Sequence, residues 1–144
     1  MNKDVHGFEQ FMKQREAAAS AYVSGDAAPV GRLVTKVAPA SFFGPMGGYI
    51  EGAEQVWSTH RNGAEQFHPG GESKLEILQM GASEGIAYWV GLQHATVHIG
   101  KSPKPTPMTL RVTEVFRRED GAWKLVHRHA DMLASESKGK SSTP

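Results

Sequence analysis

The stretch WKLVHRHAD (123–131) places several chemically capable side chains on one predicted strand. His127, Arg128, His129 and Asp131 lie within five consecutive positions. Imidazole and carboxylate groups can bind a metal or form a proton-transfer dyad, and a guanidinium group can hold an anion. The same residues can also be polar packing or part of a subunit interface, so the faces of the strand must decide between these interpretations.

A metal site is the weakest of these interpretations. His127, His129 and Asp131 alternate onto one strand face, and this spacing permits a shared metal without requiring one. The other candidate ligands, such as His60 and His94, belong to other predicted elements. We therefore predict no metal and no cofactor, and we favour polar packing or an interface for this set.

The turn between the last two strands decides which of these side chains face inward. A two-residue turn at Asp120-Gly121 would pair Glu114 with His127 and would place Arg117 opposite Lys124. Two cations directly across from each other are destabilising by up to about 1 kcal/mol.

A three-residue loop, Glu119-Asp120-Gly121, removes that repulsion and pairs Glu114 with Val126, so we favour it. One strand face is then mostly apolar and should line a pocket: Leu110, Val112, Glu114, Phe116, Val126, Arg128 and Ala130. The other face is mixed and should meet a partner subunit: Arg111, Thr113, Trp123, Leu125, His127, His129 and Asp131.

Glu114 and Arg128 are the polar groups of the apolar face, as expected for a small-molecule pocket with few anchors. Buried without a partner, Glu114 would have a raised pKa and could act as a general acid or base. Paired with Arg128, it would stay ionised and would orient a ligand or hold the pocket together, which we favour. Arg128 could also bind a ligand carboxylate itself.

Four further residues are candidate ligand contacts. Tyr22, Trp57 and His60 lie on the apolar stripes of predicted helices, and Tyr88 lies on the longest predicted strand. Packing is an equally good explanation for the aromatic residues. His60 could be a general base, although a single His on an apolar stripe is more often a hydrogen-bonded core residue.

Three helices precede the strands. Helical spacing of apolar residues covers about 4–23, a short segment with Pro29 in its first turn, and 53–67, and SFFGPMGGYI (41–50) predicts a small hairpin. From Lys74 the period becomes two, which predicts strands at 75–80, 86–99, 108–118 and 123–132. This order predicts an α+β fold with helices on one face of a mostly antiparallel sheet.

Length and composition limit the class of protein. The 144 residues fit one domain over 1–132 with a flexible tail over 133–144. The net charge of +1 gives no basic field for nucleic acid, and the chain has no cysteine. No apolar run predicts a membrane span or a secretory signal, so we expect a soluble, cytoplasmic protein.

Four segments carry a resemblance to a known family: AYVSGD (21–26), FFGPMGGYIEG (42–52), IAYWVGLQ (86–93) and RVTEVFRREDGAWKLVHRHAD (111–131). They resemble the nuclear-transport-factor-2-like superfamily, in particular its SnoaL-like and ketosteroid-isomerase-homologue branch. The last segment is also similar to the association domain of calcium/calmodulin-dependent kinase II. The resemblance implies a cone in which a strongly curved sheet wraps the first helix and leaves an apolar pocket at its open end.

The resemblance does not fix an activity, because this fold serves many functions. The position of the ketosteroid isomerase proton-abstracting Asp holds Gly44, and that of its oxyanion-hole Tyr holds Ala18, so that activity is disfavoured. The pocket arginines of the association domains match Val90, Glu114 and Ala130, so an identical specificity is not implied.

We predict a homodimeric SnoaL-like protein that binds a compact, partly apolar molecule in the cone. Any reaction would be cofactor-free proton transfer, such as isomerisation, cyclisation or dehydration. The alternative is a non-catalytic oligomerisation module like the kinase association domain.

Overall fold

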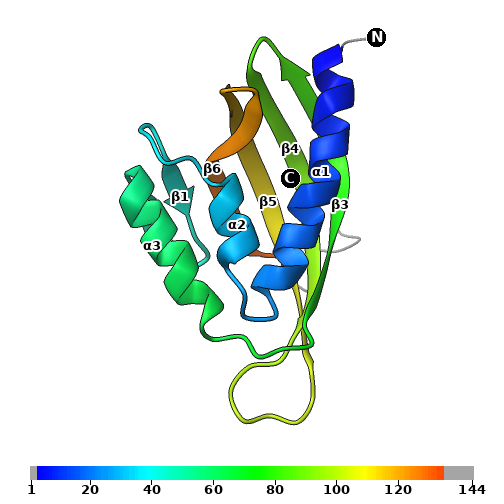
Figure 1. Ribbon diagram of the computed structural model, residues 1–144. Helices are drawn as coiled ribbons and strands as arrows, with labels where there is room; N and C mark the ends of the chain where they lie inside the picture. The colour runs from blue at the N-terminus through cyan, green and yellow to red at the C-terminus, as the bar shows by residue number, and fades with distance from the viewer. Residues whose placement is uncertain (1–2, 135–144) are drawn as a thin grey trace.

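The computed structural model describes residues 3–134, and Figure 1 shows the helices lying on one side of a sheet. The helices are α1 (Lys3–Tyr22), α2 (Ala28–Leu33) and α3 (Ala53–Ala64). The strands are β1 (Ser41–Phe43), β2 (Tyr49–Glu51), β3 (Glu72–Ser83), β4 (Ile86–Val97), β5 (Thr106–Glu119) and β6 (Ala122–Met132). The expected element order is confirmed, while residues 135–144 of the expected tail lie outside the described residues.

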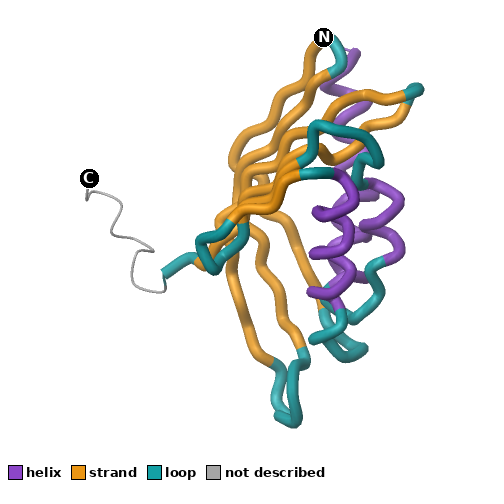
Figure 2. Tube along the Cα trace, turned by 90° about the vertical axis from the view of Figure 1, so that its left-hand side faces the viewer, coloured by secondary structure: helices purple, strands orange, loops and turns teal. Residues whose placement is uncertain are grey.

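The strands form one mixed sheet in the order β2-β1-β6-β5-β4-β3. The short strand β1 runs parallel to β6, and every other neighbouring pair is antiparallel. Figure 2 shows that the long strands bend strongly and that the helices cover the concave side. The predicted α+β cone with a curved mixed sheet is therefore confirmed, with six strands in the part of the chain that the structure describes.

Helix α1 forms the central contact of the core because its apolar residues recur at helical spacing. Phe8 and Phe11 pack against Phe116 of β5, with ring centroids 5.3 and 5.2 Å from it. Trp123 of β6 meets Phe8 edge-on at 5.6 Å. Burying each such ring contributes about 1.5–3 kcal/mol, so this aromatic cluster fixes α1 against the sheet.

The two shorter helices are positioned by a hydrogen bond at the start of α2 and by a close contact between α2 and α3. The Asp26 Oδ1 atom accepts a hydrogen bond from the Ala28 amide at 3.0 Å, which satisfies one free donor at the start of α2. A Cβ atom on Gly31 would lie 2.7 Å from the Trp57 ring. Glycine is therefore required at position 31 for α3 to pack this closely on α2.

The turn between β5 and β6 has two residues, so the expected three-residue loop is wrong. Glu119 pairs with Ala122, and Asp120 and Gly121 have φ angles of 50° and 83°. Two positive φ angles are the requirement of a type I′ hairpin turn, and its twist matches that of the strands.

The repulsion that argued against this turn is relieved by other contacts. Arg117 does lie opposite Lys124. However, Arg117 Nε donates to Glu119 Oε2 at 2.9 Å, and Lys124 Nζ donates to the Arg32 carbonyl at 2.8 Å. Each cation therefore has its own oxygen partner.

A β-bulge at Val126 then changes the register of the rest of the hairpin. Phe116 pairs with Leu125, whereas Val115 pairs with His127. The extra residue puts Glu114 directly opposite Arg128, a pairing that neither expected register contains.

The bulge also decides the two faces of β6. Trp123 and Leu125 before it, and Ala130 after it, are all buried under the helices. The expectation that Trp123 and Leu125 share a face with the histidines is wrong, and Val126 is the bulge residue rather than part of the pocket wall.

Candidate functional site

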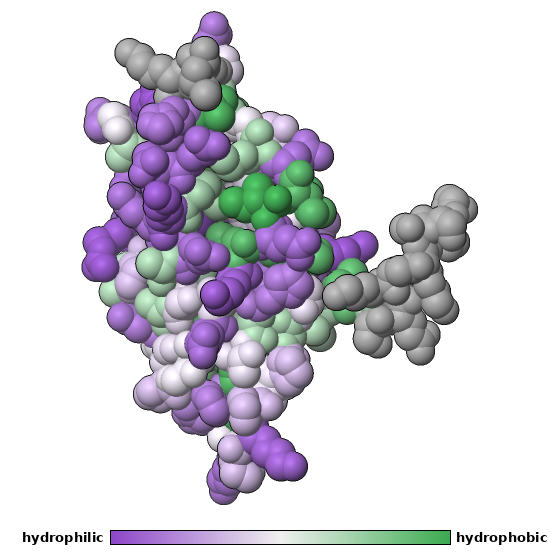
Figure 3. Space-filling view, turned by 90° about the vertical axis from the view of Figure 1, so that its right-hand side faces the viewer, coloured by the Kyte–Doolittle hydropathy of each residue, from purple (hydrophilic) through white to green (hydrophobic). Residues whose placement is uncertain are grey.

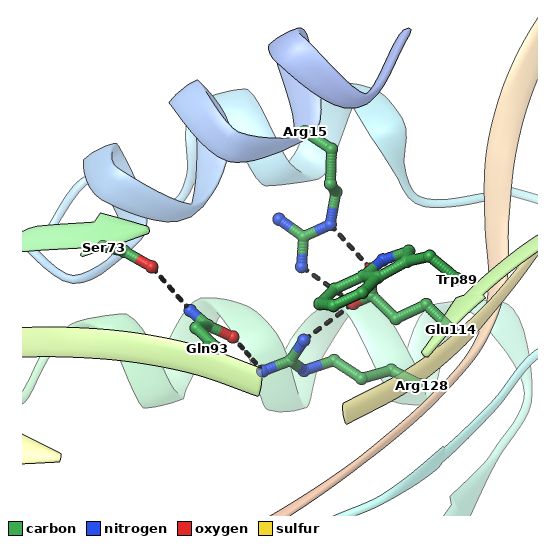
Figure 4. A network of polar contacts seen from close by, with 6 residues as sticks. All are labelled: Arg15, Ser73, Trp89, Gln93, Glu114 and Arg128. Carbon is green, nitrogen blue, oxygen red and sulfur yellow. Dashed lines mark hydrogen bonds and ion pairs between the residues drawn. The ribbon is translucent and has the colours of Figure 1, made fainter. Parts of the chain in front are cut away.

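A buried ion cluster lies where α1 crosses the inner face of the sheet (Figure 4). Glu114 of β5 is fully buried and receives two hydrogen bonds from Arg15 of α1, from Nε at 2.9 Å and from Nη2 at 2.8 Å. Arg128 of β6 donates from Nη1 to the same carboxylate at 2.7 Å. The indole Nε1 of Trp89 donates a fourth hydrogen bond at 2.8 Å.

These partners keep Glu114 ionised. Burial by itself would raise the pKa of this carboxyl, but the charges of Arg15 and Arg128 and their hydrogen bonds outweigh it and lower the pKa to about 2. A carboxylate with four donors and so low a pKa is a poor proton acceptor at neutral pH. Glu114 therefore holds the two guanidinium groups in place and does not act as a base.

The network continues from Arg128 through Gln93 and Ser73 back to α1. Arg128 Nη2 donates to Gln93 Oε1 at 2.9 Å, and Gln93 Nε2 donates to Ser73 Oγ at 3.0 Å. The Ser73 amide in turn donates to Ser20 Oγ of α1 at 3.1 Å. This chain of bonds fixes the Arg128 side chain, because both of its terminal nitrogens have partners.

Two buried polar atoms among the described residues have no partner: Arg15 Nη1 and His60 Nε2. Arg15 is 4% exposed and His60 is 6% exposed. Figure 4 shows the free terminal nitrogen of Arg15 pointing away from Glu114. An unpaired buried donor or acceptor costs about 1–3 kcal/mol, so both atoms call for a partner.

Both residues line one cavity of about 130 Å³ between α1, α3 and the inner face of the sheet. Its polar lining consists of Arg15, Tyr22, His60, Gln66, Gln93 and Arg128. Its apolar lining consists of Ala19, Val30, Phe42, Phe67, Leu125 and Ala130. An apolar cavity with a few convergent polar groups is the usual form of a small-molecule site.

His60 is neutral in this environment. Burial and the nearby charges of Arg128 and Arg15 lower its pKa to about 4. Its ring lies 4.9 Å from the Phe42 ring, and its backbone carbonyl accepts a hydrogen bond from the Tyr22 hydroxyl at 2.8 Å. Burial also raises the pKa of Tyr22, which therefore keeps its proton.

The predicted ligand contacts are only partly brought together. Tyr22, His60 and Arg128 line the cavity, and Glu114 lies behind it as the counterion of Arg15 and Arg128. Trp57 lies elsewhere, packed on Gly31 of α2.

The placement of Tyr88 in the pocket wall is wrong. Its neighbour Trp89 points inward, so Tyr88 lies on the outer face of β4, where its hydroxyl donates to Gln79 Oε1 at 3.0 Å. The inner face of this strand instead carries Ala87, Trp89, Gly91 and Gln93.

The sequence reasoning missed Arg15, Phe42 and Gln93. A signal for Arg15 was present, because it falls on the apolar stripe of α1 between Met12 and Ala19. A charged residue on a stripe that packs into a core must be paired there, so it indicates a buried ion pair.

The outer face of β6 holds the residues that first suggested a metal or a dyad. His127 Nδ1 lies 2.7 Å from Ser41 Oγ, and Phe43 packs against the rings of His127 and His129. Asp131 forms a two-bond ion pair with Arg111, at 2.6 and 2.8 Å. Within residues 3–134, no group of three or more His, Asp or Glu side chains could hold a metal ion.

Fold and site together define the chain as an α+β cone protein with a buried ion cluster in the wall of a cavity. Residues 13–135 match the SnoaL-like domain family, so the chain belongs to this family. No curated protein matches the sequence. Among residues 3–134 no helix is long and apolar enough to cross a membrane.

Solved structures share the fold at low sequence identity. A candidate dehydratase of the nuclear-transport-factor-2-like family from Streptomyces avermitilis has a TM-score of 0.77 at 19% identity, covering 92% of this chain and 100% of its own. A candidate ketosteroid isomerase from Parabacteroides distasonis has a TM-score of 0.65 at 19% identity, covering 88% of each chain. A candidate calcium/calmodulin-dependent protein kinase type II association domain from Thiobacillus denitrificans has a TM-score of 0.66 at 16% identity, covering 84% and 93%.

Proposed function

We propose that this protein binds a small molecule in the cavity lined by Arg15, His60 and Arg128. The observation that carries the proposal is the pair of buried polar atoms without partners, Arg15 Nη1 and His60 Nε2, on the wall of one cavity. Native proteins pair nearly all buried polar groups, so such a pair marks a place for a bound molecule. At about 130 Å³ the cavity has roughly ten times the space that a single water needs.

Proton transfer is the reaction that this site supports if the ligand is turned over. Glu114 is held ionised by four donors and cannot accept a proton at neutral pH. His60 is neutral, and its Nε2 atom is free to exchange a proton with a ligand in the cavity. This chemistry is compatible with isomerisation, cyclisation or dehydration, and it needs no cofactor.

The test is an NMR titration of the labelled protein with acids, amides and alcohols of two to four carbons. We expect at least one probe to give saturable shifts centred on the cavity residues. Ala130→Leu, which adds bulk to the cavity wall, should abolish these shifts. Ala122→Leu on the exposed start of the same strand is the matched control and should leave them unchanged. Saturable shifts for no probe, or shifts confined to the outer face, would contradict the proposal.

A second candidate function is oligomerisation through the outer face of the sheet. Phe43 and Tyr49 are 40% and 69% exposed there, and Leu78 is 63% exposed on β3. Figure 3 shows hydrophobic residues gathered near the centre of a face that includes the β3 side of the molecule. Exposed apolar groups of this extent are typical of an interaction surface, and a homodimer is the form we propose.

Sedimentation of point variants tests this second function. Phe43→Ser should shift a dimer to the monomer, whereas Val37→Ser, which changes an exposed apolar residue just beyond α2, should not. Ala130→Leu separates the two functions in the folded fraction, because it fills the cavity on the inner face and leaves the outer face unchanged. Lost ligand binding in an intact dimer supports the cavity as the functional site. If the unsubstituted protein and the variant are both dimers and neither binds a probe, the result supports the oligomerisation module alone.

A further inference from the structure

We infer that the ligand is a short organic monoanion, a carboxylate that also carries one uncharged polar group such as a hydroxyl. This inference rests on the proposed function of the cavity and specifies the chemistry of its ligand. It follows from the charge of the cluster and from the two free polar atoms.

The buried cluster has an excess of one positive charge. Arg15 and Arg128 share the single carboxylate of Glu114, at 2.8 and 2.7 Å. Among the residues that line the cavity, no other side chain is charged, because His60 and Tyr22 are neutral. An uncompensated buried charge is costly, so a ligand with one negative charge is favoured over a neutral one.

The cluster nitrogen that lacks a hydrogen-bond partner also belongs to one of the two arginines. Arg15 uses Nε and Nη2 on Glu114, and Nη1 is the one nitrogen of its guanidinium group without a partner. Arg128 has both terminal nitrogens bonded, to Glu114 and Gln93. A ligand carboxylate that accepts from Arg15 Nη1 would give this nitrogen a partner and supply the missing negative charge.

His60 supplies the second point of recognition. Its Nε2 atom belongs to a neutral ring, which accepts from a hydroxyl or donates to a carbonyl according to the tautomer. It would not attract a second carboxylate. The site therefore favours one charge and one neutral polar group, and a dianion would leave an unpaired negative charge in the cavity.

Binding constants for four small probes test the inference at pH 7. Propionate should bind at least tenfold more tightly than propionamide, its uncharged isostere, because charge-assisted hydrogen bonds are about twice as strong as neutral ones. Lactate should bind several-fold more tightly than propionate, and malonate should bind more weakly than propionate. Chloride, the inorganic source of the same charge, should displace lactate only far above the lactate Kd.

Two variants separate the two contacts. Arg15→Met should bring the propionate to propionamide ratio close to one, whereas Arg111→Met on the outer face makes the same change in net charge and should leave the ratio intact. His60→Leu should remove the advantage of lactate over propionate and should retain the preference for charge. If Arg15→Met does not fold, the ratios of the unsubstituted protein still decide.

The outcomes distinguish this inference from the proposed function. Propionamide binding in the cavity as tightly as propionate would overturn the inference and leave the ligand site standing. Malonate binding more tightly than propionate, or chloride displacing lactate at equal concentration, would also overturn it. Binding of no probe in the cavity would contradict the proposed function as well.

Discussion

Strands β5 and β6 carry two acid and arginine pairs that differ mainly in which face they occupy. Glu114 lies directly opposite Arg128, and Arg111 lies directly opposite Asp131. In the first pair the side chains are 0% and 12% exposed, and in the second they are 62% and 27% exposed. The pairs lie three positions apart, so they point to opposite sides of the sheet.

The difference in burial gives the same chemistry two different consequences. Breaking a buried pair leaves a charge without water or counterion, while exposed groups are solvated whether or not they meet. The inner pair is also joined by Arg15, Trp89 and Gln93, so its positions are fixed by several elements. We therefore expect changes to the inner pair to alter stability and binding, and changes to the outer pair to do little.

The largest effect is expected for Glu114→Gln. The substitution keeps the shape of the side chain but leaves Arg15 and Arg128 facing each other without a counterion. The free energy of unfolding, measured by urea denaturation, should fall by about 3–5 kcal/mol. Asp131→Asn is the matched control on the outer face and should cost less than about 1 kcal/mol. Similar losses for the two variants would contradict the role that we assign to burial.

A smaller loss is expected for Arg15→Met. This variant removes one cation but leaves Glu114 paired with Arg128 and Trp89, so the buried cluster becomes neutral. The free energy of unfolding should fall by about 1–3 kcal/mol, mainly for the lost hydrogen bonds. The urea midpoints of the two variants provide the comparison. A loss as large as that of Glu114→Gln would show that the net charge of the buried cluster does not determine the loss of stability.

The pH dependence of stability reports on His60. Its pKa is about 4 in the folded chain and 6.5 in the unfolded chain, so only the unfolded chain takes up a proton between these values. Stability is therefore lost as the pH falls from about 6.5 towards 4. Between pH 7 and pH 5 the free energy of unfolding of His60→Leu should fall by about 2 kcal/mol less than that of the unsubstituted protein. The measurement is urea unfolding of both proteins at pH 7 and at pH 5. If the two proteins lost the same free energy of unfolding between these pH values, a neutral, buried His60 would be excluded.

The smallest effect is expected for the outer pair. A double-mutant cycle of Arg111→Met and Asp131→Asn should give a coupling of less than about 1 kcal/mol that falls further at high salt. A salt-independent coupling of several kcal/mol would mean that this face is covered in solution, as it would be in the proposed dimer.

The sequence was a good guide to the elements but a poor guide to the register of the last hairpin. The period of two along β5 correctly separated Glu114 from Thr113 and Arg111, because alternation within one strand needs only local geometry. The turn was predicted wrongly because the repulsion between Arg117 and Lys124 was counted without their other partners, Glu119 and the Arg32 carbonyl. The bulge at Val126 has no marker in the sequence, and it reverses the faces of the residues before it.

By itself the sequence determined the order of helices and strands, the apolar stripe of α1 and the position of one acid on the apolar face of β5. Only the tertiary structure decided that Arg15 meets this acid, from 99 positions away in the chain. The sequence also predicted that the arginine of HRHAD turns inward and that both histidines and Asp131 remain outside, but the two-residue turn and the bulge that produce this arrangement were seen only in the tertiary structure. The physical reason is that periodic patterns arise from the local backbone, whereas partners and burial depend on how the bent sheet closes around α1.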